Sequence, residues 1–145
     1  MNTILSYMTG VHGHCDELFA VAEQSVAKKN WPDAMSAFEA FIEASNKHFA
    51  TEEEVLFPRL EQRMGHAGGP TQVMRMEHAQ MQSLFDSLAA QLQSESQEEF
   101  LGGAETLLIL MQQHNMKEEQ ILYTMADQLL AAERGAVIEA IENYQ

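Results

Sequence analysis

The sequence predicts an all-α fold: an antiparallel up-down-up-down four-helix bundle followed by a short C-terminal helix. Three observations support this prediction. Apolar residues recur every three or four positions over most of the chain, which is the spacing of one face of an α-helix. β-branched residues are sparse and no stretch alternates for long, so strands are not indicated. The breaks between the periodic segments are short, as they are between antiparallel neighbours in a bundle.

The first half of the bundle contains two predicted helices. The first runs over about residues 9–29, with Val21 among the residues on its apolar face. Residues 30–33 then read Asn-Trp-Pro-Asp, which is typical of a helix end followed by a new first turn. A second helix follows, and Pro58 should kink or weaken its last turns, because proline lacks a backbone N–H.

The second half repeats this arrangement after a Gly-rich loop at residues 65–70. A third helix is predicted over about residues 70–93, and a fourth helix runs to about residue 131. The bundle should therefore occupy about residues 9–131. A short tail helix is predicted over about residues 133–144.

Composition favours a single domain over residues 1–145, a length sufficient to bury one good core. No apolar run approaches the ~20 residues that cross a membrane, and the N-terminus lacks the pattern of a signal peptide. The single cysteine cannot form an internal disulfide and fits a reducing compartment, so a cytoplasmic location is expected. The formal net charge of −14 argues against nucleic acid and anionic membranes as partners. The sequence leaves any protein partner and the oligomeric state open.

One motif occurs twice, at residues 48–60 and 114–126. Each copy gives a histidine, a glutamate four residues later, a second glutamate, and then an apolar-apolar-aromatic run. Residues four apart share a face of an α-helix, so each copy directs an imidazole and a carboxylate the same way. The pairs are His48 with Glu52 and His114 with Glu118. Both pairs lie on apolar stripes, which makes two ordinary exposed ion pairs the less favoured interpretation.

A central polar layer in such a bundle needs a contribution from every helix, and the other two helices offer His14 and His78. Four imidazoles and two carboxylates suit iron, manganese or zinc better than calcium or magnesium. Six ligands exceed what a closed tetrahedral zinc site uses. Two metals bridged by two glutamates would use all six and keep open positions. The candidate metal ligands are His14, His48, Glu52, His78, His114 and Glu118.

Three nearby polar residues are assigned differently. Glu119 is an alternative to Glu118 as a ligand, and spacing alone leaves this choice open. His12 lies two positions before His14, so it should point away from the centre, toward the surface. Gln82 lies four positions after His78, and a contact with a metal or its bound water is left open.

These residues resemble the hemerythrin-like, or HHE cation-binding, domain family. The resemblance rests on a histidine before Asp-Glu-Leu, on Glu-His at 77–78, and on both copies of the repeated motif, and it covers about residues 9–131. It implies a non-haem centre of two iron ions, oxo- or hydroxo-bridged, that binds O2, NO or related small species. Oxygen-carrying members place a second histidine where this chain has Gln82. The set of four histidines and two glutamates is more similar to the branch that includes iron-sulfur repair and iron-sensing domains.

The expected function is therefore binding or sensing of O2, NO or related small species at a dinuclear iron centre. The expected partner is a small diatomic or peroxide ligand. Two alternatives stay open: iron storage or buffering, and oxidoreductase activity that decomposes peroxide at a low rate. The sequence does not decide whether the chain is an enzyme.

Overall fold

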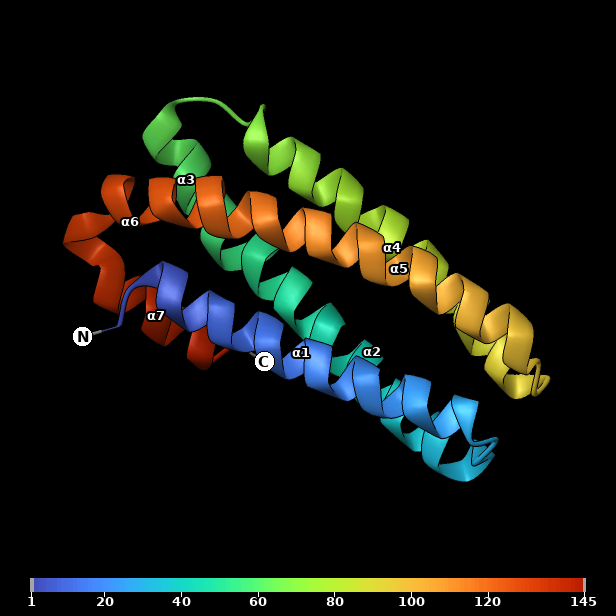
Figure 1. The fold of residues 1–145 in the computed structure, drawn as a ribbon. Helices are drawn as coiled ribbons and strands as arrows, with labels where there is room; N and C mark the ends of the chain where they lie inside the picture. The colour runs from blue at the N-terminus through green and yellow to red at the C-terminus, as the bar shows by residue number, and fades with distance from the viewer. Residues whose placement is uncertain (1, 145) are drawn as a thin grey trace.

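In a computed structural model that describes residues 2–144, four long helices form the predicted antiparallel bundle, with a short helix after it (Figure 1). The long helices are α1 (Ile4–Ala27), α2 (Trp31–Thr51), α4 (Pro70–Gln93) and α5 (Gln97–Lys117). A first π-helical turn (Glu52–Leu56) and α3 (Phe57–Met64) extend α2, and a second π-helical turn (Glu118–Leu122) and α6 (Tyr123–Leu129) extend α5. A 3-10 turn (Ala131–Glu133) leads to the C-terminal helix α7 (Arg134–Glu142). No strand occurs within residues 2–144.

The first helix begins at Ile4, several residues before the predicted start. Thr3 and Ser6 form a capping box, which satisfies backbone N–H groups that lack partners inside the helix. Asp127 on α6 accepts two further hydrogen bonds, from the N–H of Ile4 at 2.8 Å and that of Leu5 at 3.1 Å. Because Asp127 is distant in sequence, a local pattern does not predict that it extends this helix.

The breaks between helices follow the predicted signals. The side chain of Asn30 accepts a hydrogen bond from the N–H of Asp33 at the start of α2, and proline occupies the first turn. Gly65 ends α3 with φ of 82°, a left-handed conformation that glycine adopts without strain. Pro70 then opens α4, as expected for a residue with no N–H to satisfy.

The apolar core consists of two clusters with a polar layer between them. The cluster that extends toward the α1–α2 and α4–α5 connections contains six phenylalanines: Phe19, Phe38, Phe41, Phe49, Phe85 and Phe100. The other cluster joins the start of α1 to α3, α6 and α7, and includes Ile4, Leu56, Leu60, Tyr123 and Ile138. On α1 the buried stripe passes from one cluster to the other through Met8, His12 and Cys15. Val21, predicted on the apolar face, lies off this stripe and is 50% exposed.

Both copies of the repeated motif contain a π turn, where a continuous α-helix was predicted. The N–H of Phe57 donates to the carbonyl of Glu52, and the N–H of Tyr123 donates to that of Glu118, each five residues earlier. Pro58, predicted to kink or weaken the last turns of the second helix, lies two residues after the first π turn, in the first turn of α3. In a π turn, residues five apart lie on nearly the same face, whereas in an α-helix they differ by about 140°. Each aromatic residue is therefore brought onto the face of its glutamate.

Candidate metal centre

Six side chains from the four long helices and the two π turns meet between the apolar clusters. They are His12, His48, Glu52, His78, His114 and Glu118, each at most 5% exposed. They form two groups whose ligand-type atoms lie within 4.8 Å of one another. One group is Glu52, His78, His114 and Glu118, and the other is His12, His48 and Glu118. Glu118 belongs to both groups, so the two groups form one continuous cluster.

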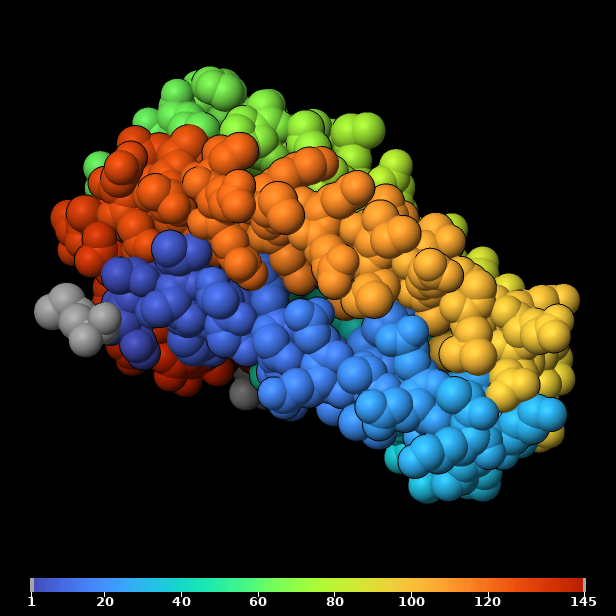
Figure 2. Space-filling view, in the orientation of Figure 1, coloured from blue at the N-terminus to red at the C-terminus, as the bar shows by residue number. Residues whose placement is uncertain are grey.

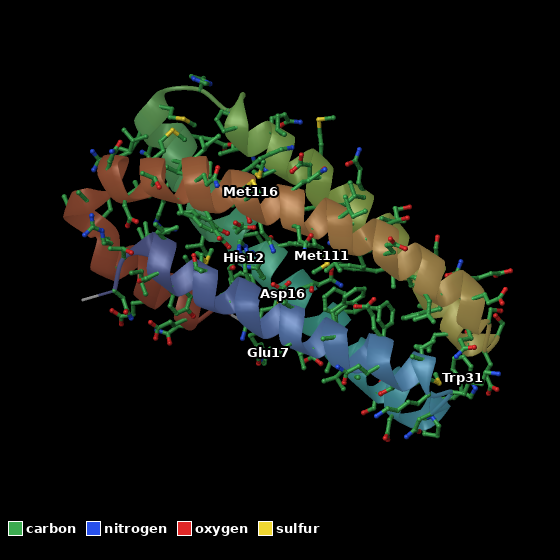
Figure 3. All side chains as sticks on the ribbon, viewed as in Figure 1. His12, Asp16, Glu17, Trp31, Met111 and Met116 are labelled. Carbon is green, nitrogen blue, oxygen red and sulfur yellow. The ribbon has the colours of Figure 1, made fainter. Side chains whose placement is uncertain are left out.

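The structure corrects the predicted orientation of His12 and His14. His12 is 4% exposed and points from α1 into the bundle (Figure 3), whereas His14 lies at the surface. Two residues apart on a helix point in nearly opposite directions, so only one of this pair can face the centre. The buried stripe of α1 decides between them, since His12 lies four positions after Met8 and three before Cys15. That spacing is visible in the sequence and was the signal that could have identified His12.

The polar atoms at the centre lie close together yet do not satisfy one another. His78 Nε2 is 3.1 Å from Glu52 Oε1, and His114 Nε2 is 3.2 Å from Glu118 Oε1. Both nitrogens and Glu52 Oε1 are nevertheless buried without a hydrogen-bond partner. Buried polar groups without partners are costly, and they are rare in folded proteins. A cation bound between these nitrogen and oxygen atoms would satisfy their lone pairs.

Three of the four histidines are held from behind by a carboxylate. Glu119 Oε2 lies 2.7 Å from Nδ1 of His12, and Glu53 Oε2 lies 2.6 Å from Nδ1 of His78. Similarly, Glu77 Oε1 lies 2.8 Å from Nδ1 of His114, and Lys117 also contacts Glu77. A carboxylate that accepts from Nδ1–H leaves the Nε2 lone pair free for a metal, an arrangement typical of histidine ligands. The fourth histidine, His48, has a buried Nδ1 without a partner.

The two adjacent glutamates of each motif thus have different surroundings. Glu118 is fully buried at the centre, while Glu119 is about one-third exposed and contacts His12. Glu52 and Glu53 divide in the same way, with Glu53 contacting His78. Of the alternatives left open by spacing, the structure therefore brings Glu118 rather than Glu119 to the centre.

The structure does not bring Gln82 to the centre. Its side chain is exposed and donates a hydrogen bond to Asn46 Oδ1 at 3.1 Å. The residue of this turn that faces inward is Met81, which is 2% exposed. Since α4 continues inward through Met81 and Phe85, position 82 falls on the outer side of the helix.

Sequence reasoning also missed the hydroxyl group of Tyr123. This residue is fully buried, and its oxygen lies 2.7 Å from Glu52 Oε2 and 2.9 Å from Glu118 Oε1. His12 Nε2 is 3.1 Å away. The π turn gives Tyr123 this position, because it moves the residue onto the face of Glu118.

The closely spaced ionisable groups at the centre raise the pKa of some of its residues and lower that of others. Burial alone would lower the pKa of His114, but the nearby carboxylates of Glu118 and Glu52, and that of Glu77 at its Nδ1, raise it to about 9. Burial and the neighbouring Glu118 carboxylate raise the pKa of Glu52. Burial would also raise the pKa of Glu118, but the neighbouring Glu52 and the surrounding histidines lower it. Without a metal, His114 therefore carries a proton at neutral pH.

Two cavities lie on the His12 and His48 side of the cluster. The inner one has a volume of about 20 Å³, and its wall includes His12, Cys15 and His48. The outer one, of about 270 Å³, lies between α1, α2 and α7 and shares Cys15 and His48 with the first. Since a water molecule needs roughly 10–15 Å³ measured in this way, the inner cavity admits only very small molecules.

A separate polar cleft lies between α1 and α5, where the surface is hollowed (Figure 2). Its wall includes Asp16 of α1 and Glu119. The carboxylate that holds His12 from behind is therefore in contact with solvent.

The family model for the hemerythrin HHE cation binding domain matches residues 3–126. Searches of curated proteins and of solved structures gave no match. Among the described residues, no helix is both long enough and apolar enough to cross a membrane.

Proposed function

Since this chain belongs to the hemerythrin HHE cation-binding family, we propose that its buried His/Glu cluster holds two iron ions and binds a small species such as O2 or NO. The proposed ligands are His12, His48, Glu52, His78, His114 and Glu118, with His12 in the place predicted for His14. The observation that carries the proposal is the convergence of these six buried side chains, several of whose lone pairs have no partner.

The surroundings of the histidines support a metal rather than a simple network of ion pairs. In an ion-pair network, each ring nitrogen would meet a carboxylate oxygen in hydrogen-bond geometry. Here the carboxylates of Glu53, Glu77 and Glu119 occupy the Nδ1 side of three rings, and the inward Nε2 atoms of His78 and His114 remain without hydrogen bonds. This combination is the one that orients imidazoles toward a metal.

The arrangement in two groups supports two ions rather than one. Six nitrogen and oxygen donors exceed the four of a closed tetrahedral site. The two groups share Glu118, whose two oxygens can serve different ions. Mixed imidazole and carboxylate donors suit iron, which is also the metal that the family resemblance implies.

The small inner cavity supports a small ligand. Iron, when bound, supplies open coordination positions at which O2 or NO binds. The protein's contribution is to limit access, because about 20 Å³ beside His12 and His48 has room for one water-sized molecule. Met81 and Phe85 complete an apolar wall there, which favours a neutral diatomic molecule over a charged substrate.

Metal analysis combined with visible spectroscopy tests this proposal. Protein produced with ample iron should contain two irons per chain, and the reduced form should change its spectrum on exposure to air or NO. Two irons with no response to either gas would favour storage or buffering. Steady consumption of peroxide would favour an oxidoreductase. Protein that binds no metal, or only one ion at saturation, would contradict the dinuclear proposal.

A further inference from the structure

The hydroxyl group of Tyr123 lies among the proposed ligand atoms themselves. Its oxygen is within 2.7–3.1 Å of Glu52 Oε2, Glu118 Oε1 and His12 Nε2. The side chain is fully buried. A group that merely fills space could be phenylalanine, so the oxygen requires an explanation at the centre.

The first motif has a phenylalanine at the position that corresponds to Tyr123. Phe57 occupies the same place in the first motif, five residues after Glu52, and is also fully buried. Its ring packs near that of His78, with centroids 6.0 Å apart. The two π turns therefore present a phenyl ring to one side of the centre and a phenol to the other.

The two ligand groups also differ in the number of side chains that they contain. The group beside Phe57 contains four side chains, Glu52, His78, His114 and Glu118. The other group contains three, His12, His48 and Glu118. The Tyr123 oxygen is within hydrogen-bond distance of His12, which belongs to the smaller group alone, and of Glu118, which belongs to both groups. It also contacts Glu52, which belongs to the larger group. Phenol oxygen is also an established donor to iron in proteins.

We propose that Tyr123 is a further metal ligand, whose oxygen completes the position formed by His12, His48 and Glu118. The inference rests on the proposed function, because it assigns a seventh residue to the same centre. As the metal–oxygen bond forms, the O–H bond breaks and the proton leaves to solvent, so no oxidant or reductant is required. The two metal positions then differ in kind, one with a phenolate oxygen and one without.

Resonance Raman and visible spectra of the ferric protein test this assignment. Ferric iron bound by phenolate gives an intense visible charge-transfer band, and excitation in that band enhances tyrosine ring vibrations. Wild-type protein should show both signals. Tyr123→Phe, which removes one oxygen and keeps the ring, should lose both, and the dissociation constant of one iron should rise about tenfold or more.

A double variant provides the matched control. The chain has three tyrosines, so Tyr7→Phe with Tyr144→Phe leaves Tyr123 as the only one. Tyr144 contacts Glu54 and Tyr7 lines the outer cavity, and neither contacts a proposed ligand through a hydrogen bond in the described structure. The double variant should retain the full band and the enhanced vibrations.

The outcomes separate this inference from the function on which it rests. Wild-type protein with two ferric irons and no enhanced tyrosine vibrations would overturn the role of Tyr123 and leave the dinuclear centre intact. The same conclusion would follow from a Tyr123→Phe spectrum identical to the wild type. Wild-type protein that takes up no iron would overturn both. The wild-type spectrum alone is decisive, so the test does not depend on the folding of the variant.

Discussion

Nδ1 of His12 lies 2.7 Å from Oε2 of Glu119, although the two residues are 107 positions apart in the chain. This contact joins α1 to the second π turn and determines which edge of the imidazole faces the centre. With Nδ1–H directed to Glu119, the Nε2 lone pair points toward Glu118 and His48. The helix α1 directs His12 inward, whereas the orientation of its ring is set by a partner from another part of the chain.

Because α1 directs His12 inward and His14 outward, substitutions of these two histidines should differ in their effect on metal content. His12→Ala should remove one metal ion per chain or more, because it deletes one of three side chains in its group. His14→Ala should retain both ions, because His14 is at the surface. Elemental analysis after gel filtration measures this difference. Metal loss in His14→Ala with retention in His12→Ala would restore the assignment predicted from sequence.

The adjacent glutamates of the second motif should also differ. Glu118→Ala should abolish dinuclear binding, since Glu118 belongs to both groups. Glu119→Ala should retain two ions but raise their dissociation constants about 10–100-fold, the usual effect of losing a carboxylate behind a histidine ligand. Glu54→Ala is the control, because Glu54 is exposed and contacts Tyr144. Competition with a chelator gives the constants, and a stronger effect of Glu119→Ala than of Glu118→Ala would reverse the two roles.

Substitution of Gln82 should leave the centre unchanged. Gln82→His adds an imidazole on the outer side of α4, where the present side chain contacts Asn46. Metal content, the visible spectrum and azide or NO stoichiometry should equal those of the wild type. A new ligand field in this variant would mean that α4 can rotate enough to bring position 82 inward.

Metal binding should release protons at neutral pH. The pKa of about 9 for His114 means that the metal-free protein carries a proton there, and a metal ion must displace it. Titration of metal into weakly buffered protein at pH 7 should therefore acidify the solution, and the contribution of His114 should disappear as the pH rises through about 9. Metal addition without acidification would contradict a protonated His114.

The same pKa gives the sign of a stability change in the metal-free protein. A raised pKa stabilises the folded state below the ordinary histidine pKa of about 6.5, and this contribution is lost as the pH rises through about 9. Urea midpoints of the metal-free protein should therefore fall between pH 7 and pH 10. His114→Gln, which cannot titrate, should show a smaller fall.

Removal of the metal should lower thermal stability. An ion at a thousandfold excess over its dissociation constant stabilises the native state by about 4 kcal/mol. For a chain of this size that corresponds to a rise in Tm of about 10 °C. Thermal melts with and without metal measure it, and Glu118→Ala should show little difference between the two. Equal midpoints for the wild type would indicate that these residues bind no metal in the folded state.

The sequence predicted the bundle and much of the centre because both depend on helical periodicity. His48 with Glu52, and His114 with Glu118, needed only the rule that residues four apart share a face. His12 required the phase of α1 over its whole length, and that phase is set by Met8, Cys15 and Phe19 rather than by the residues beside the histidine.

The position of Tyr123 was harder to predict. A π turn differs from an α-helix by a single change of hydrogen-bond partner, and no residue type marks it as glycine or proline marks a turn. The partnership of Glu77 with His114 was also not readable, because it connects different helices. These features depend on packing between segments rather than on spacing within one.

The three carboxylates behind the histidines have a consequence for the movement of charge. Glu53, Glu77 and Glu119 have side chains that are 36%, 20% and 33% exposed, while the imidazoles they contact are almost fully buried. Each pair is thus a relay of one hydrogen bond between the interior and water. A proton displaced at the centre can leave along such a relay without any helix moving apart. Protons can therefore pass between the solvent and the buried cluster by three short routes that do not admit larger solutes.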